Sequence, residues 1–495
     1  MTDTVTRLPI ESIHLRGPES RTLQARLTAG IVQAILEQSL APGTLLPSSR
    51  ALAQAMNLSR MTVTLVYQEL VAQGYLEARP RSGVVVAQGA PTRTLAEVAE
   101  TGADTGRPVD WDGWLAGIAP RRRVIRKPEN WRSLRWPFIY GQADARLFDD
   151  AAWRECARRA LSAREFGGLA DDLLEQDDPM LIDHIRSHTL PRRGIAAGPD
   201  EVLITMGSQN ALYMTVNLLA RPDQTAAIEE PGYPDFAETL RRAGARIALL
   251  PVDADGLDPG AIPPATRLVI ATPSHHVPTG ATMSPDRRAM LLERAAAGDF
   301  LIVEDDYDFE MSYLAPPMPA LKSMDRDKRV IYLGSFSKSL FPGLRIGYMV
   351  AAPELIAAAR SSRAVMLRHA PPHQQRITAW FLALGYYDTH ITRLREALKT
   401  RRTALTASLK DTPLTIAGAD VAGGSALWMA APEGMDSARL AAAAARRGVL
   451  IEPGAVFFER PPDPCRYFRM GYSSIAAGDI PEGVAELVRA VRDIA

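Results

Sequence analysis

From about residue 135 onward, short apolar runs alternate with longer stretches of helical spacing. This alternation predicts a doubly wound α/β domain, in which helices cover a large sheet. The last hundred residues, with strands expected at 424–429 and 466–470, predict a smaller C-terminal α+β lobe. The strands expected in the large domain are residues 202–205, 226–229, 268–271, 301–304 and 330–333.

The N-terminal part of the chain predicts a separate unit. At 495 residues the chain is too long for a single core. Apolar residues recur at helical spacing, serines stand where helices begin, and a hairpin follows. The helices are expected at 21–38, from Ser48 and Ser49 onward, and at 59–73, and the strands at 75–78 and 84–87.

The third helix of this unit predicts a DNA-reading surface. Its inner face is apolar, whereas its outer face carries hydroxyls and a guanidinium, which can bind phosphates and base edges. A three-helix bundle used for protein contacts is the alternative for this pattern alone. Candidate DNA contacts are Ser59, Arg60, Thr62 and Thr64 on the third helix, Ser48, Ser49 and Arg50 on the second, and Arg79, Arg81 and Gly83 at the hairpin tip.

The charge distribution agrees with this division. The net charge is zero, yet residues 1–135 contain 17 Lys and Arg against 12 Asp and Glu. A modest basic excess suits a unit that contacts phosphates. Residues 88–134 are expected to be a linker, because 88–130 contains Gly, Thr, Ala and Pro, two tryptophans and the run Arg121-Arg-Arg123.

The composition also indicates in which cellular compartment the protein is expected. Only Cys156 and Cys465 occur, so neither a disulfide framework nor a zinc cluster is expected. The start of the chain lacks the apolar core of a signal peptide, and no apolar run approaches the roughly 20 residues that span a bilayer. We therefore expect a cytoplasmic protein without a membrane segment or a metal, associated with the nucleoid when bound to DNA.

Polar residues at strand ends of the large domain suit pyridoxal phosphate (PLP) chemistry. This cofactor needs a lysine for its imine, a carboxylate at its pyridine nitrogen, a donor at its ring oxygen and an anion site for its phosphate. Lys338 follows the strand at 330–333, and Asp305 and Tyr307 follow the strand at 301–304. Taken singly, these residues also fit a surface lysine, a helix cap or metal ligand, and a core aromatic.

The phosphate site is expected where a strand leads into a helix. Gly207, Ser208 and Gln209 follow the strand at 202–205, and a helix N-terminus binds anions through its backbone N–H groups. Ser335 and Arg345, on either side of Lys338, could complete this site.

The order of these motifs resembles two known families. Leu58-Ser-Arg60, Tyr67-Gln-Glu-Leu70 and Gly74-Tyr-Leu76 resemble the GntR-type winged helix over about residues 20–87. Glu230-Pro-Gly-Tyr233, residues 272–280, 304–310 and 334–345 resemble fold-type I aminotransferases over 135–495. The combination resembles the MocR subfamily of GntR-type transcriptional regulators.

This resemblance implies roles for individual residues. Lys338 is implied as the imine lysine, Asp305 as the pyridinium partner and Tyr307 as the ring-oxygen donor. Tyr233 would stack on the ring, while Ser335 and Arg345 would hold the phosphate. Arg469, in the motif Phe468-Arg-Met-Gly-Tyr472, matches the arginine that binds a substrate carboxylate.

The resemblance further implies a head-to-tail homodimer that binds double-stranded operator DNA. A small amine or amino acid would act as effector by displacing Lys338 to form an external aldimine. Two alternatives stay open: a working aminotransferase with an accessory DNA-binding head, and a repressor whose large domain has lost PLP. The sequence leaves open the effector, the operator, the regulated genes, whether the protein activates or represses, and any transamination.

Three positions depart from the family pattern. Val277 stands where many aminotransferases place an asparagine against the ring oxygen, which favours sensing over catalysis. Residues 176–181 lack the Tyr and Gly usual around Asp178-Pro179, so the effector pocket wall is expected to differ. Asp235 stands where a relative that senses γ-aminobutyrate would carry an arginine, so a γ-amino acid is disfavoured and an effector with a second amine comes into question.

Overall fold

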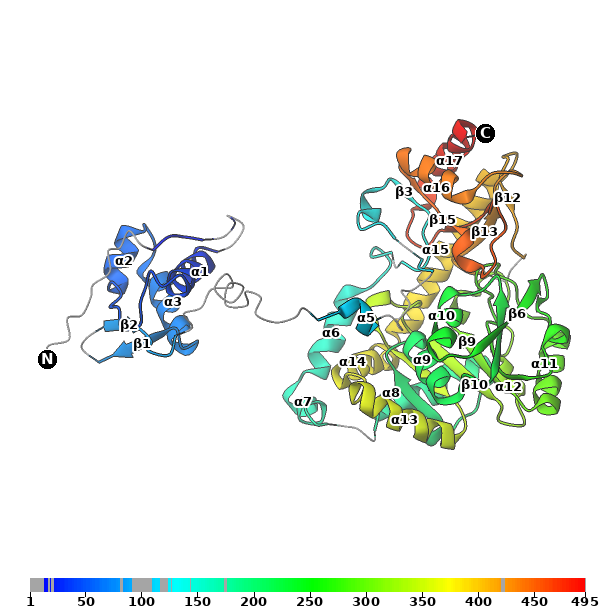
Figure 1. Ribbon diagram of the computed structural model, residues 1–495, viewed down its shortest axis with the longest axis horizontal. Helices are drawn as coiled ribbons and strands as arrows, with labels where there is room; N and C mark the ends of the chain where they lie inside the picture. Colours follow the sequence, from blue (N-terminus) through cyan, green and yellow to red (C-terminus); the bar gives the residue numbers. More distant parts are fainter. Residues whose placement is uncertain are drawn as a thin grey trace. The chain divides into compact units, whose positions relative to one another are not determined.

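The computed structural model forms two compact units, Met1–Ala119 and Pro120–Ala495 (Figure 1). Each unit is considered by itself. The structure describes residues 13–16, 18, 22–80, 83–90, 109–115, 123–125, 127–142, 144–172, 176–419 and 423–494. Arg81, Arg121 and Arg122 lie outside these residues.

In the described part of the first unit, helices α1 to α3 and a hairpin surround one apolar core. Helices α1, α2 and α3 begin at the side-chain caps Thr22, Ser48 and Ser59, whose hydroxyls accept backbone N–H groups at 3.0–3.2 Å. Such caps satisfy N–H groups that the first turn of a helix leaves unpaired. The elements are α1 (Leu23–Leu36), α2 (Ser49–Ala55), α3 (Arg60–Ala72), β1 (Leu76–Arg79), β2 (Gly83–Val86) and the short α5 (Trp111–Leu115).

The core of this unit is formed by the apolar faces of the helices, as the helical spacing of apolar residues predicts. Leu27, Ile31 and Ile35 of α1 pack with Val63 and Leu70 of α3. The hairpin pairs β1 with β2 antiparallel. Its strands lie within one residue of the expected positions 75–78 and 84–87.

An eight-stranded sheet dominates the second unit. Its order is β4-β11-β10-β9-β8-β5-β6-β7, and the pairs β10/β9, β9/β8, β8/β5 and β5/β6 are parallel. The five expected strands are present, and three further strands, β6, β7 and the internal antiparallel β11, were not expected. The strands are β4 (Val202–Thr205), β5 (Thr225–Glu230), β6 (Arg246–Asp253), β7 (Gly256–Leu257), β8 (Thr266–Ala271), β9 (Leu301–Asp306), β10 (Val330–Ser335) and β11 (Gly347–Val350).

Helices pack around this sheet. Figure 1 shows the green helices α9, α10 and α11 around strands β9 and β10. Helix α9 contacts both β10 and β11, and α10 contacts β5 and β6. The helices are α6 (Asp150–Ala160), α7 (Ala163–Leu169), α8 (Pro179–His184), α9 (Ser208–Leu219), α10 (Pro234–Arg242), α11 (Pro285–Gly298), α12 (Leu321–Met324), α13 (Pro353–Leu367) and α14 (Pro372–Ala383).

Short helical turns connect many of these elements. They are η2 (Trp131–Ser133), η3 (Ile185–Thr189), η4 (Pro191–Arg193), η5 (Pro199–Glu201), η6 (Pro259–Ala261), η7 (Phe309–Met311), η8 (Pro342–Leu344), η9 (Gly454–Phe457) and η10 (Ala477–Asp479). None of the helices within the described ranges is long and apolar enough to cross a membrane.

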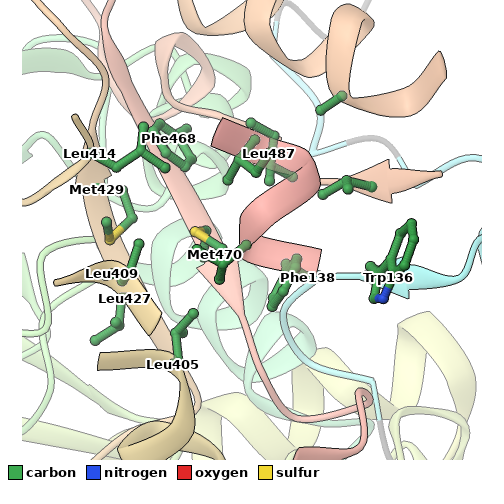
Figure 2. Packing of buried hydrophobic residues seen from close by; sticks show 14 of the residues in the cluster. Trp136, Phe138, Leu405, Leu409, Leu414, Leu427, Met429, Phe468, Met470 and Leu487 are labelled. Carbon is green, nitrogen blue, oxygen red and sulfur yellow. The ribbon is translucent and has the colours of Figure 1, made fainter. Parts of the chain in front are cut away.

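The C-terminal lobe is an antiparallel sheet of order β12-β13-β16-β15 covered by helices. Figure 2 shows Phe468 and Met470 of β16 packed toward Leu487 of α17, with Trp136 and Phe138 beside them. The elements are β12 (Thr415–Ile416), β13 (Ala426–Ala430), β14 (Val449–Leu450), β15 (Glu452–Pro453), β16 (Tyr467–Gly471), α15 (Tyr386–Leu409), α16 (Ser437–Arg446) and α17 (Ile480–Ile494).

The beginning of the second unit therefore belongs to this lobe. Strand β3 (Trp136–Pro137) pairs in parallel with β14, and Phe138 is fully buried in the lobe's core. The residues described between 123 and 134, which were expected to be linker, are part of this unit. Their anchoring contacts are made with residues more than 300 positions later, which local patterns do not reveal.

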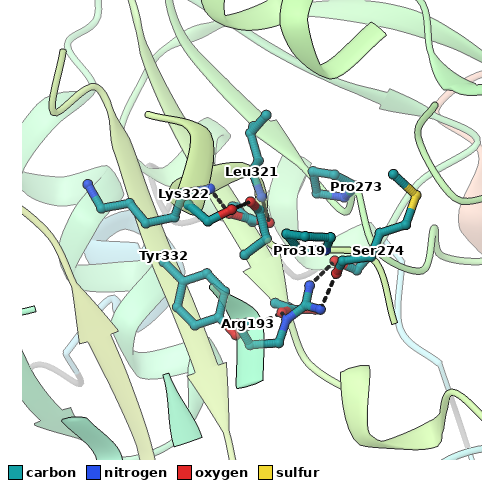
Figure 3. Close-up of polar contacts among 12 residues, drawn as sticks. Arg193, Pro273, Ser274, Pro319, Leu321, Lys322 and Tyr332 are labelled. Carbon is teal, nitrogen blue, oxygen red and sulfur yellow. Dashed lines mark hydrogen bonds and ion pairs between the residues drawn. The ribbon is translucent and has the colours of Figure 1, made fainter. Parts of the chain in front are cut away.

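A buried polar network ties the strand ends of the large sheet together (Figure 3). The fully buried Arg193 donates from Nε to Asp306 Oδ2 at 2.7 Å and from Nη2 to Ser274 Oγ at 2.7 Å. The Tyr332 hydroxyl donates to the same Asp306 oxygen at 2.7 Å. Buried charges are stable only when they are paired in this way, so the network fixes the end of β9.

We expect Arg193→Met to destabilise the second unit, because it leaves Asp306 buried without its cation. Breaking a buried ion pair in this way costs about 3–5 kcal/mol. Urea unfolding followed by far-UV circular dichroism should show a lower midpoint. Arg192→Met is the matched control, because Arg192 pairs with Asp388 on the surface and such a pair contributes only about 0–1 kcal/mol. Equal midpoints for the two variants would contradict this role of Arg193.

Candidate functional site

A cavity of about 310 Å³ in the second unit gathers the candidate residues of the large domain. It lies where β9 and β10 end, which is the edge at which α/β sheets bind ligands. Nine of the ten predicted cofactor and effector residues line it, and the tenth, Gly207, directly precedes Ser208. The nine are Ser208, Gln209, Tyr233, Asp305, Tyr307, Ser335, Lys338, Arg345 and Arg469.

Lys338 follows β10 and projects into this cavity. Its side chain is accessible within the cavity although protein surrounds it, and Nζ lies 4.6 Å from the centre of the Tyr140 ring. A Cβ at Gly141, whose φ is +71°, would come within 2.7 Å of Nζ. Burial and the nearby cations Lys127 and Arg469 lower the pKa of Lys338 to about 8. About a tenth of this amine is therefore neutral and nucleophilic at pH 7, far more than for a lysine with the usual pKa.

Asp305 lies at the end of β9, paired in register with Leu333 of β10. Burial and the neighbouring Asp306 raise the pKa of Asp305 to about 7, although Lys338 opposes this effect. Its buried Oδ1 has no hydrogen-bond partner among the described residues. An unpaired buried carboxylate oxygen is unfavourable, and a pyridinium N–H is a partner that would fit it.

Tyr307 supplies a protonated hydroxyl two residues beyond Asp305. Burial and Asp308 raise the pKa of Tyr307 well above its usual value, so the hydroxyl remains a donor. In this structure it donates to the carbonyl oxygen of His275 at 3.0 Å. Val277 also lines the cavity and offers only methyl groups there.

A guanidinium lies beside the N-terminus of α9. Gly207 caps this 12-residue helix with φ +86°, and Arg345 Nη2 donates to the carbonyl of Met206 at 2.8 Å. A Cβ at Gly207 would lie 2.9 Å from Arg345 Nη2, so glycine is needed for this close approach. A helix N-terminus together with a guanidinium suits a phosphate group.

Arg469 presents its guanidinium to the same cavity from β16. Its Nε donates to Glu452 Oε2 at 2.8 Å, and its guanidinium carbon lies 4.2 Å from the centre of the Tyr140 ring. Within the described part of the chain, its two terminal nitrogens donate no hydrogen bond. These nitrogens form a planar fork suited to an acid group.

Other cavity residues were not predicted. Tyr140 lies against both Lys338 and Arg469, and Val124, Ile125 and Lys127 come from the expected linker. The Tyr233 hydroxyl is 3.2 Å from Asp235 Oδ2, to which it donates.

The first unit brings several DNA-contact candidates into one groove of about 890 Å³. Ser48, Ser49, Thr64 and Gly83 line it, together with Gln68, which was not predicted. Arg50, Arg60 and Arg79 are exposed, and Arg81 lies outside the described residues. Several hydroxyls are already engaged: Ser48 and Ser59 cap helices, Thr62 Oγ1 is 2.8 Å from Ser59 Oγ, and Thr64 donates to the Arg60 carbonyl.

Comparisons with known proteins agree with both units. Residues 23–86 match the family of bacterial regulatory proteins of the gntR type, and residues 157–481 match the aminotransferase class I and II family. The fold and the two matches define a transcriptional regulator that joins a helix-turn-helix DNA-binding domain to an aminotransferase-like domain. The chain belongs to the MocR type of GntR-family regulators, as the sequence motifs predicted.

The relatives span nearly the whole chain. The HTH-type transcriptional regulator TauR of Rhodobacter capsulatus is 46% identical over 98% of this chain and 100% of its own length. The probable rhizopine catabolism regulatory protein MocR of Rhizobium meliloti is 32% identical over 95% of this chain and 93% of its own.

Among solved structures, the α-aminoadipate aminotransferase LysN of Thermus thermophilus, complexed with N-(5'-phosphopyridoxyl)-L-leucine, has a TM-score of 0.68. It is 26% identical, and the match covers 78% of this chain and 99% of LysN. The aminotransferase class I and II family to which the second unit belongs binds PLP. The predicted fold class is confirmed.

We expect added PLP to react with the ligand-free protein at a rate set by the neutral form of Lys338. Because the pKa of Lys338 is about 8, the rate of growth of the visible absorbance band should rise with pH and reach half its plateau near pH 8. Below this value each pH unit should slow the reaction about tenfold. Stopped-flow absorbance measures the profile, and Lys338→Ala should show no such band. A half-plateau near the usual lysine pKa would contradict this prediction.

Proposed function

We propose that this regulator binds PLP at Lys338 and senses a small amine or amino acid through it. The observation that carries the proposal is the shared cavity, in which a lysine of lowered pKa faces a buried carboxylate with an unpaired oxygen. When bound, PLP supplies a carbon at which an incoming amine can take the place of Lys338.

Each residue of the cavity has a role in this proposal. Asp305 holds the pyridine nitrogen in its protonated form, and Tyr307 donates to the ring oxygen. Tyr233 packs on the ring. The phosphate is bound by the α9 terminus and its neighbours, namely Gly207, Ser208, Gln209, Ser335 and Arg345.

Sensing is favoured over turnover by Val277. In place of a polar group at the ring oxygen, Val277 brings methyl groups to the cavity wall. An aminotransferase activity is the second candidate, because Lys338, Asp305 and Arg469 line one cavity. Steady formation of keto acid from an amino donor with 2-oxoglutarate would favour that activity over sensing alone.

The output of the proposed sensor is a change in operator binding. The domains that we propose are a winged helix at 20–87 and an effector domain that contains residues 123–134 as well as the predicted range 135–495, so the linker predicted at 88–134 is shortened to end before the second unit begins at Pro120. The winged helix would bind double-stranded operator DNA as part of a head-to-tail homodimer. Effector binding changes this output only if the effector prefers one arrangement of the protein.

We expect Lys338→Ala to remove the effector response while leaving operator binding intact. Without this amine PLP is not held as the imine of Lys338. An effector amine then has no lysine imine to replace. Band-shift titrations of wild type and variant, with PLP and a panel of amines and amino acids, measure this response. An operator affinity of wild type that is unaltered by PLP and every amine would refute the sensing proposal.

We expect Arg60→Ala to weaken operator binding and to leave the visible band of bound PLP unchanged. Arg60 is exposed at the start of α3, and loss of one guanidinium contact to a base costs about 1–3 kcal/mol. Fluorescence anisotropy with operator DNA measures this cost. Arg16→Ala is the matched control, since Arg16 is an exposed arginine of the same unit that lies outside α2, α3 and the hairpin. Equal affinities of the two variants would exclude Arg60 from the DNA interface.

A further inference from the structure

One wall of the cavity comes from the very beginning of the second unit. We call residues 123–125 and 127 the strap. Val124, Ile125 and Lys127 of the strap line the cavity with Lys338 and Arg469. Ile125 packs against the cluster that contains Tyr140, Val277 and Tyr307. The strap is therefore part of the site, although it follows closely on Pro120, where the second unit begins.

Arg123 anchors the strap to the loop that follows η9. Its guanidinium pairs with Glu459 and donates from Nη1 to the carbonyl of Val456 at 3.2 Å. Glu459 also pairs with Arg241 of α10, and its backbone N–H donates to Glu230 at 2.9 Å. The side chains of Arg123 and Glu459 are only 18% and 17% exposed, so this anchor is largely withdrawn from water.

The helical turn η9, which precedes this loop, contacts the guanidinium of Arg469. Phe457 belongs to η9, and the guanidinium carbon of Arg469 lies 4.7 Å from the centre of its ring. The strap, the loop and Arg469 thus form one continuous corner of the cavity.

Lys127 adds a cation to this corner. Burial lowers the pKa of Lys127, while Glu452 raises it and Arg469 lowers it, so both charges are near its ammonium. Among the described residues no carboxylate lies within ion-pair distance of Lys127, whereas Arg469 is paired with Glu452 at 2.8 Å. An acid group could therefore approach the Lys127 ammonium without displacing a carboxylate of the described residues.

The family resemblance implies that Arg469 binds a carboxylate, and we infer that Lys127 is a second contact for this acid group and determines the specificity for it. This inference rests on the proposed function and deepens it. Arg469 supplies a planar fork, and Lys127 supplies an ammonium that has no carboxylate partner among the described residues.

The site connects effector binding with the chain that leads to the first unit. With PLP bound, the amine end of the effector would take the place of Lys338 at the end of β10, and Lys127 would bind the acid end from the strap. An effector with both groups bridges the sheet and the strap, whereas an amine without an acid group binds only on the sheet side. The acid group is thus what distinguishes an effector from other amines.

The experiment compares acids with their neutral amides in Lys127→Met, Lys127→Arg and wild type. The probes are alanine with alaninamide and β-alanine with β-alaninamide, titrated into the PLP-loaded full-length protein by visible absorbance. We expect wild type to prefer at least one acid over its amide. Lys127→Met should weaken binding of that acid about tenfold or more and leave the amide unchanged, because one charge-assisted contact is lost. Lys127→Arg should retain most of the preference.

The controls separate this inference from the proposed function. Lys399→Met, which removes an exposed lysine of α15, should bind both probes as wild type does. If neither acids nor amides change the absorbance of wild type, the proposed function itself is wrong. If the probes bind but wild type has no preference for an acid, or Lys127→Met keeps that preference, the sensing proposal stands and the acid site at Lys127 is overturned.

Discussion

The parallel pairing of β9 with β10 is the constraint on which the second unit depends. It sets Asp305 opposite Leu333 and brings the segment that carries Lys338 to the same edge as Asp305 and Tyr307. Arg193 then fixes the end of β9 by pairing with Asp306. The same guanidinium also donates hydrogen bonds to Ser274 and to the carbonyl of Met318. The nucleophile and the carboxylate are therefore positioned by backbone register and by a buried ion pair, with no dependence on flexible side chains at the surface.

Burial at this edge acts oppositely on acids and bases. It raises the pKa values of Glu229, Asp305 and Glu310 to about 7, and it lowers that of Lys338 to about 8. Groups that would be fully charged in water are thus close to changing protonation state near neutral pH. Such a setting suits a site that exchanges one amine for another, because neither the resident lysine nor its surroundings are locked in one charge state.

Much of this arrangement could be predicted from local sequence. The five predicted strands contain apolar runs, and the residues that follow them fall at the carboxyl edge because parallel strands end there. Strand β11 was missed because it runs antiparallel between β4 and β10, an arrangement that the alternation typical of a doubly wound sheet does not predict. The strap was missed because its charged residues, Arg123 and Lys127, are typical of a polar linker. The residues near them in the fold lie more than 300 positions later in the sequence, at Val456, Glu459 and Arg469. No local period encodes contacts of that separation.

The anchor of the strap also gives the two units different sensitivities to salt. Contacts between exposed arginines and DNA phosphates release counterions, so their affinity falls steeply as ionic strength rises. The Arg123–Glu459–Arg241 cluster is largely shielded from solvent, and ions screen buried pairs much less. Ionic strength can therefore detach this regulator from DNA while the cavity of its second unit keeps its shape, so salt separates the two units' responses to their surroundings.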